Sequence, residues 1–219
     1  TSGDFQGKKR MLGENAVLEA LRRFAAEVTE KMSHPGGEPE EQLRAPFEAF
    51  MGSVGEAVGP RRVCKGETLI PGRVGKPDYA IHSSGALTGY VELKAPGKNA
   101  DPDRYSGHDL RQWKRFQAIP NLIYTDGNSW ALYRSGECEG RIVHLAGDVT
   151  SDGVEAVEER DARRVLDLIT NFLSWSPIIP TDRRGKLILD EFSEMLAPLC
   201  RMLRENVVDA LSDADSPLV

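Results

Sequence analysis

The segment GKPDYAIHSSGALTGYVELKAPGK, residues 75–98, contains two short apolar runs with charged residues at their ends. Residues 78–82 and 87–93 have the composition of β-strands, and the small polar residues between them are typical of a hairpin turn. If the two strands pair, Asp78 at the start of the first lies close to Glu92 near the end of the second. Acids at strand ends contribute little to packing, so this pattern indicates chemistry.

Glu92 and Lys94 are two positions apart, so their side chains point to the same face of a strand, opposite Leu93. Two converging carboxylates, here Asp78 and Glu92, repel each other unless a cation relieves the repulsion. Oxygen ligands without Cys or His are typical of Mg²⁺ or Mn²⁺, which can activate water and neutralise a phosphate. A lysine beside that water orients it, helps to deprotonate it, or holds the phosphate.

The remaining hydrophobic pattern predicts an α/β sandwich around a mixed central sheet, with additional helices at both ends. Helices are predicted over residues 12–32, 39–58, 108–119, 155–174 and 186–211, and strands over 61–70, 78–82, 87–93, 121–125, 129–134 and 141–145. Pro46 is expected to kink the second helix or to end its first turn. Residues 95–107 form a long polar loop, of the kind that is usually functional or disordered.

The pair Pro77-Asp78, followed by Glu92-Leu93-Lys94, resembles the signature of the PD-(D/E)xK nucleases, which have a restriction-endonuclease-like fold. The resemblance implies an αβββαβ core over residues 38–125 and hydrolysis of phosphodiester bonds with Mg²⁺, for which Mn²⁺ substitutes. It implies that Asp78, Glu92 and the backbone carbonyl of Leu93 are metal ligands and that Lys94 is the catalytic lysine.

Two further residues follow from the same resemblance. Many members add a glutamate from the helix before the sheet, and Glu40 matches because it lies along the apolar stripe of that helix, with Glu41 as the alternative. Some members carry a Q-x-x-x-Y element in the next helix, which Gln112 fits with Phe116 in place of the tyrosine. Gln112 is therefore expected to orient the metal-bound water or a phosphate.

More narrowly, three stretches resemble the N-terminal nuclease domain of bacterial restriction–modification and phage-defence proteins that carry an adenine-N6 methyltransferase. They are EEQLR at 40–44, the loop after VELKAPG, and PNLIYTDGNSWALYR at 120–134. In addition, LAPLCRMLRENVVDAL at 196–211 is similar to the connector that leads from the nuclease to the methyltransferase in those proteins. The chain has no methyltransferase motif of its own, so a further domain or a separate subunit is the expected partner. We expect residues 1–150 to form the nuclease core and 151–219 a helical extension that packs on it or links it to a partner.

The net charge of −6 argues against a nucleic-acid partner, but the charge is unevenly distributed. Residues 60–115 carry 11 Lys and Arg against 6 Asp and Glu. This basic group predicts phosphate contacts from Lys76, Lys98, Arg111, Lys114 and Arg115, and Trp113 is the tryptophan best placed to stack on bases.

The sequence excludes several other classes of protein. No apolar run approaches the roughly 18 residues of a membrane span, the N-terminus has no signal peptide, and three scattered cysteines form no CxxC zinc pair. We therefore expect a cytoplasmic bacterial protein. The main hypothesis is a Mg²⁺-dependent DNA endonuclease of a restriction or anti-phage system, and cutting both strands predicts a homodimer or a transient pair. The alternatives are a catalytically inactive DNA-binding or scaffold domain and an RNA-directed nuclease.

Overall fold

The computed structural model describes residues 2–34, 36–58, 62–66, 70, 74–83 and 86–175. The chain divides into two units, of which the first comprises Thr1–Thr68 and Pro77–Trp175 and the second Leu69–Lys76 and Ser176–Val219. In the second unit, Ile70 and Gly75 form an isolated antiparallel bridge. The helix predicted over 186–211 lies outside the described residues.

The first unit is built on a mixed sheet. Its strands are β1 (Arg62–Gly66), β2 (Tyr79–Ser83), β3 (Ala86–Leu93), β4 (Leu122–Thr125), β5 (Ser129–Arg134), β6 (Glu137–Cys138) and β7 (Val143–His144). They are ordered β1-β2-β3-β4-β5-β6, with β7 paired to β5. Only β3 and β4 pair in parallel among these strands, which requires a crossover between them, and that crossover contains α3 (Gly107–Phe116).

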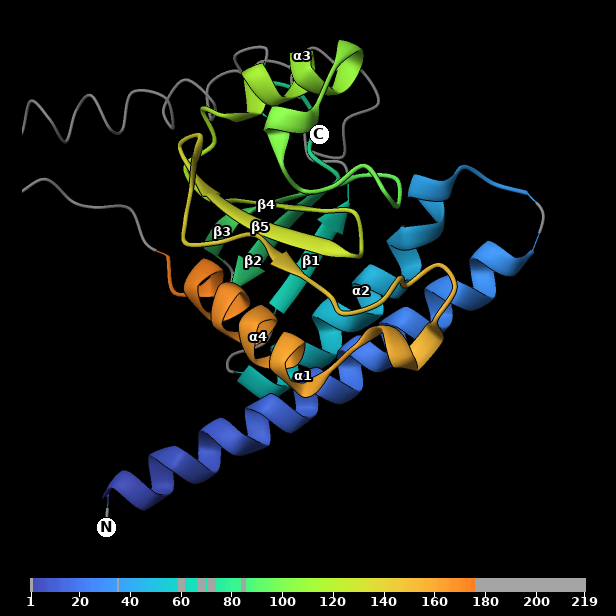
Figure 1. Ribbon diagram of the computed structural model, residues 1–219. Coiled ribbons are helices and arrows are strands. Elements are labelled where there is room, and N and C mark those ends of the chain that lie inside the picture. Colours follow the sequence, from blue (N-terminus) through green and yellow to red (C-terminus); the bar gives the residue numbers. More distant parts are fainter. Residues whose placement is uncertain are drawn as a thin grey trace, which may run out of the picture. The chain divides into compact units, whose positions relative to one another are not determined.

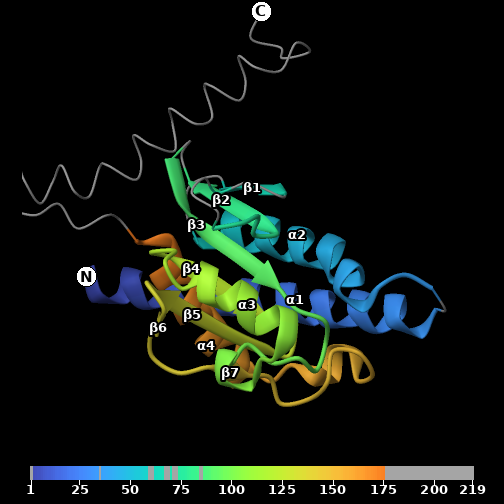
Figure 2. The same ribbon diagram turned by 90° about the horizontal axis from the view of Figure 1, so that it is seen from above.

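Helices cover both faces of this sheet (Figures 1 and 2). The long helices α1 (Ser2–Ser33), α2 (Pro39–Val58) and α4 (Glu159–Leu173) lie on one face, and α3 lies alone on the other. Two short 3-10 helices, η1 (Pro102–Arg104) and η2 (Gly153–Ala156), complete the described elements. The order α2-β1-β2-β3-α3-β4 is the predicted αβββαβ core, so the expected fold class is confirmed.

The main hydrophobic core lies between the sheet and the three-helix face. Inward side chains of alternate strand positions, such as Val91, Leu93 and Leu132, meet Phe47 and Phe50 of α2 there. Trp130 is fully buried among the phenylalanines of α1 and α2. The opposite strand positions, including Glu92, face α3, so the polar residues of β3 are separated from this core.

Several elements differ from their predicted form. Pro46 does not end the second helix, since α2 runs continuously from Pro39 to Val58 and Pro46 is buried inside it. Packing of the apolar stripe outweighs the hydrogen bond that a proline removes. The strand predicted over 141–145 is reduced to Val143–His144, and β6 was not predicted because two exposed residues give no periodic signal. In the described part of the chain, no helix combines the length and apolarity needed to cross a bilayer.

Candidate active site

The end of β3 brings together the acids and the lysine that the sequence singles out. The antiparallel register pairs Tyr79 with Val91, so the preceding residue, Asp78, lies opposite Glu92 at the edge of the hairpin. Lys94 directly follows β3, and its backbone N–H donates to the Thr125 carbonyl at the end of β4, which keeps it aligned with the sheet. Asp78, Glu92 and Lys94 are 7%, 2% and 3% exposed. Such burial of three charged groups requires specific partners.

Both carboxylate oxygens of Asp78 accept hydrogen bonds. The backbone N–H of Leu93 donates to Oδ2 at 2.7 Å, and Arg44 Nη2 donates to Oδ1 at 2.6 Å. Arg44 comes from α2 and its Nε also lies 2.9 Å from Glu41 Oε2. Burial raises the pKa of Asp78 above its usual value, although the Leu93 N–H and the Arg44 guanidinium both act to lower it.

Glu92 and Lys94 form a buried pair. Lys94 Nζ donates to Glu92 Oε1 at 2.7 Å and to Gln112 Oε1 at 2.6 Å, so it connects β3 with α3. The second carboxylate oxygen, Glu92 Oε2, is buried and has no hydrogen-bond partner among the described residues. Burial raises the pKa of Glu92 to about 8, and the nearby Lys94 only partly opposes this shift.

Glu40 lies in the first turn of α2 and is half-buried. Burial raises the pKa of Glu40, the charge of Lys94 lowers it, and Asp78 raises it further, so all three groups are close enough to interact. Its neighbour Glu41 has a side chain that is 59% exposed and turns to Arg44. Of the two glutamates considered from the sequence, Glu40 is the one that the structure brings to Lys94.

The oxygen atoms of this cluster fit a hard divalent cation. The donors offered by Asp78, Glu92 and Glu40 are carboxylate oxygens, and Glu92 Oε2 is a buried acceptor without a partner in the described part of the chain. Leu93 donates its N–H to Asp78, and its carbonyl stays a predicted ligand. As the side chains are arranged, however, no group of three or more His, Cys, Asp or Glu among the described residues could hold a metal ion. Lys94 and Arg44 instead provide the positive charges beside Glu92 and Asp78.

Helix α3 connects the site to a basic surface. Gln112 faces Lys94, Phe116 is buried, and Trp113 packs edge-on against Tyr124 and Tyr133, with centroid distances of 5.5 and 4.7 Å. Trp113 therefore packs α3 onto the sheet while staying partly exposed, and its stacking on bases stays a prediction.

The predicted DNA contacts fall into three groups. Arg111, Lys114 and Arg115 share an exposed face of α3, and none has a carboxylate within ion-pair distance in the described part of the chain. Lys98 is exposed, with Nζ 3.1 Å from Asp109 Oδ2. Lys76 is also exposed but belongs to the second unit.

Sequence reasoning missed two residues of the site. Arg44 follows Glu40 by four positions, which places both on one side of a helix, and this spacing was an available signal. Tyr124 pairs with Glu92 across the parallel β3–β4 register, which a single sequence does not specify. The ring of Tyr124 lies below the ammonium group of Lys94, with Nζ 5.8 Å from the centroid.

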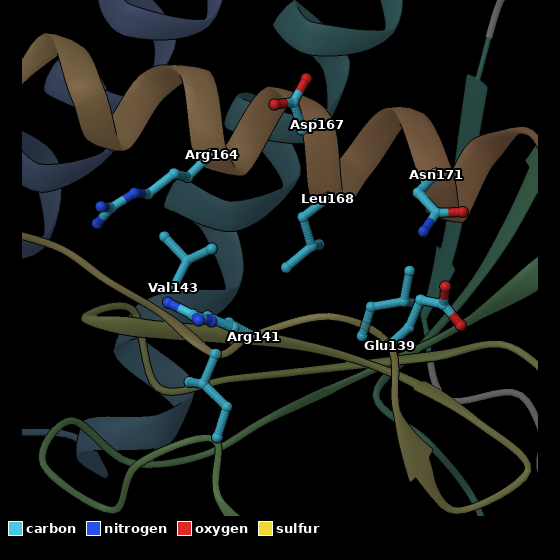
Figure 3. A pocket seen from close by; sticks show the side chains of 9 residues that line it. Glu139, Arg141, Val143, Arg164, Asp167, Leu168 and Asn171 are labelled. Carbon is cyan, nitrogen blue, oxygen red and sulfur yellow. The ribbon is translucent and has the colours of Figure 1, made fainter.

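A cavity of about 550 Å³ lies elsewhere, between α4 and the chain from β5 to β7 (Figure 3). Its lining includes the apolar Leu132 and Leu168 together with Arg141, Arg164 and acidic side chains. None of the predicted site residues lines it. Because its lining carries both positive and negative side chains, the cavity shows no preference for one class of ligand.

One solved structure supports the fold assignment. A chain of the DrdV–DNA complex, determined by electron cryo-microscopy, matches this chain with a TM-score of 0.50 and 21% sequence identity. The match covers 90% of this chain but 18% of that chain, so this chain spans less than a fifth of the length of that neighbour. No family model and no curated protein matched the sequence.

Proposed function

We propose that this chain is a Mg²⁺-dependent endonuclease domain that hydrolyses phosphodiester bonds in DNA. The observation that carries the proposal is the convergence of Asp78 and Glu92 beside buried Lys94, with Glu92 Oε2 buried and lacking a partner among the described residues. Burying such groups is costly, and in proteins this cost is typically tolerated where a site binds a cation or does chemistry.

The residues have distinct roles in this proposal. Asp78, Glu92, Glu40 and the Leu93 carbonyl would hold Mg²⁺ or Mn²⁺. The bound ion would supply Lewis acidity, which lowers the pKa of water and neutralises charge on the phosphate. Lys94, fixed between Glu92 and Gln112, would donate a hydrogen bond to the attacking water or to a phosphate oxygen.

DNA is the proposed substrate for two reasons. The neighbour of similar fold is described as a complex with DNA, and the same helix that presents Gln112 to the site carries the exposed cations Arg111, Lys114 and Arg115. Because this chain spans a small part of that neighbour, we propose that it acts with another domain or subunit, such as a methyltransferase, in a bacterial restriction or phage-defence system. We also propose that two copies come together to cut both strands.

The test is plasmid cleavage with Mg²⁺, with Mn²⁺ and with EDTA. The variants are Asp78→Asn, Lys94→Gln and, as a matched control, Asp103→Asn, which changes an exposed acid in the loop after β3. Asparagine is preferred at position 78 because alanine would leave the buried Leu93 N–H without its acceptor. We expect metal-dependent cleavage that falls by at least about a hundredfold in Asp78→Asn and Lys94→Gln and is unchanged in the control.

A second candidate function is a DNA-binding domain without catalysis. One observation favours it: Lys94 and Arg44 already provide a cation for each buried carboxylate. Calorimetry with Mg²⁺ separates the two functions. Absence of both cleavage and metal binding by the wild type would exclude the nuclease and leave the binding domain, whereas metal binding without cleavage would point to a missing partner. Matched DNA and RNA substrates decide between the two nucleic acids.

A further inference from the structure

Two neighbouring side chains of the site each have a buried oxygen without a partner. Glu92 on β3 and Tyr124 on β4 are paired in the parallel register, so both side chains emerge on the face that carries α3. Within the described residues, neither Glu92 Oε2 nor the Tyr124 hydroxyl has a hydrogen-bond partner. Buried polar atoms in native proteins almost always have a hydrogen-bond partner, so two such atoms without one on paired residues need an explanation.

In the described part of the chain, the missing hydrogen-bond partner is specific to Tyr124 and is not shared by the two tyrosines that pack against it. Tyr105 and Tyr133 pack against it, with centroid distances of 5.9 and 6.0 Å. The Tyr105 hydroxyl donates to the Asn99 carbonyl, and the Tyr133 hydroxyl donates to the Ala100 carbonyl, both at 2.8 Å. The fold thus satisfies the two flanking hydroxyl groups with protein atoms, whereas the hydroxyl of Tyr124, the residue paired with Glu92, has no such partner among the described residues.

Tyr124 also touches the lysine of the site. Lys94 Nζ lies 5.8 Å from the centroid of its ring, within the range of a cation–π interaction, and Glu92 Oε1 accepts from the same Nζ. Burial and the adjacent Glu92 carboxylate raise the pKa of Tyr124, so the phenol remains a hydrogen-bond donor at neutral pH. The phenol of Tyr124 and the carboxyl group of Glu92 are therefore buried polar groups on paired residues, and both approach Lys94.

We propose that the Tyr124 hydroxyl and Glu92 Oε2 together bind one water molecule, and that Tyr124 is a positioning residue that orients the Glu92 carboxylate through it. A water between the Tyr124 hydroxyl and the Glu92 carboxyl oxygen has two polar partners, as a buried water needs, whether that carboxyl group is protonated or ionised. The existence of the water depends only on the fold. The role of Tyr124 in orienting a metal ligand rests on the proposed nuclease function.

Tyr124→Phe removes only the hydroxyl, and Tyr133→Phe is the matched control because it removes a hydroxyl that has a protein acceptor. We expect Tyr133→Phe to lower the melting temperature by about 2–4 °C. Tyr124→Phe should change it by less than about 1 °C, since no bond between protein groups is removed. Tyr124→Phe should also weaken Mg²⁺ binding in calorimetry by about three- to tenfold and lower kcat by at least about tenfold, with KM for DNA unchanged.

A crystal structure of the metal-free protein at high resolution tests the water directly. Density within hydrogen-bonding distance of both oxygens, absent in Tyr124→Phe, would support the proposal, and an empty space in the wild type would overturn it. If Tyr124→Phe bound Mg²⁺ as tightly as the wild type and had the same kcat, the positioning role would be overturned. A loss of stability in Tyr124→Phe equal to that in Tyr133→Phe would also overturn it. If the wild type neither bound Mg²⁺ nor cleaved DNA, the proposed nuclease function would be refuted, and the positioning role of Tyr124 with it. The crystal structure would still show whether the water molecule is bound.

Discussion

Glu92 is almost completely buried, which disfavours its ionised form, yet a metal ligand has to be ionised. Its pKa of about 8 lies above the ordinary value of 4.5, so the folded protein favours the protonated carboxyl. This preference contributes stability that is fully present below pH 4.5 and is lost as the pH rises through about 8. A metal ion needs the ionised form, so binding must release a proton below pH 8.

We therefore expect Mg²⁺ affinity to rise by up to about tenfold per pH unit from pH 6 to pH 8 and to level off above that. Isothermal titration calorimetry at pH 6.5, 7.5 and 8.5, in buffers of different ionisation enthalpy, measures both the affinity and the released proton. The burial of Asp78 and Glu40 acts in the same direction, because the pKa of each is also raised. An affinity independent of pH over this range would show that Glu92 is not a ligand.

At the residue scale, the sequence predicted which acids and which lysine meet, because strand alternation and a short hairpin fix their relative places. The short turn left little freedom for Asp78 and Glu92 to lie apart. Arg44 and Tyr124 were not identified, since their contacts depend on how α2 and β4 dock against the hairpin. The contacts of Trp113 with Tyr124 and Tyr133 were not predicted, because its neighbours on α3 are basic while these contacts come from the sheet.

The loop between β3 and α3 is ordered by one buried carboxylate. Asp126 Oδ2 accepts from the N–H groups of Gly97 at 3.1 Å and Asn99 at 2.7 Å. Its Oδ1 accepts from the N–H of Asn128 and from the N–H and hydroxyl of Ser129. The sequence left open whether this polar loop is disordered, since the partner that orders it lies on another loop more than twenty residues away.

Asp126→Asn should destabilise the protein by about 2–4 kcal/mol, because the amide nitrogen replaces an acceptor that faces backbone N–H groups. Asp103→Asn, an exposed position in the same loop, should change the free energy of unfolding by less than about 0.5 kcal/mol. Urea denaturation at pH 7 measures both variants. Equal stabilities would mean that the Asp126 contacts contribute nothing net to folding.

The close approach of α4 to the sheet depends on Gly89. A Cβ there would lie 2.5 Å from the Asn121 carbonyl oxygen and 2.7 Å from the Phe172 ring. Asn121 occupies this junction, where its side-chain amide donates to the carbonyls of Thr88 and Phe172. The periodicity of apolar residues therefore predicts β3 and α4 as separate elements. The distance between them depends on Gly89, whose role becomes visible only in the packed structure.

Gly89→Ala should cost about 2–3 kcal/mol of stability through overpacking. Gly52→Ala makes the same chemical change on an exposed face of α2, where a Cβ meets nothing within 4 Å, and should stabilise by about 0.5–1 kcal/mol. Thermal unfolding of the two variants should thus shift in opposite directions. A destabilised Gly52→Ala together with an unaffected Gly89→Ala would contradict the described packing.

At the scale of the first unit, the main hydrophobic core and the proposed site lie on opposite faces of one sheet. The face toward α1, α2 and α4 buries the main hydrophobic core, and the face toward α3 carries Glu92, Tyr124 and the buried tyrosines. Conservative changes on the α3 face therefore remove chemical groups without opening the core. This separation makes it feasible to test the site and its nucleic-acid surface in proteins that stay folded.

The same separation gives a test of the nucleic-acid surface. The chain has a net charge of −6, so any DNA affinity must come from a local excess of cations rather than from the total. We expect Arg111→Gln, Lys114→Gln and Arg115→Gln, combined in one variant, to weaken binding at low salt. The slope of log K against log salt should become shallower by up to about 2.7, or about 0.9 for each phosphate that is no longer neutralised.

The matched control combines Arg160→Gln, Arg163→Gln and Arg164→Gln on α4, which changes the net charge equally on the opposite face of the sheet. Fluorescence anisotropy of a labelled duplex in EDTA, measured over a range of salt concentrations, compares the two triple variants with the wild type. The α4 variant should keep the wild-type slope, because the positions of the charges, and not their sum, determine how many counterions the DNA releases. An equal reduction of the slope in both variants would mean that binding follows net charge alone and that α3 is not the contact surface.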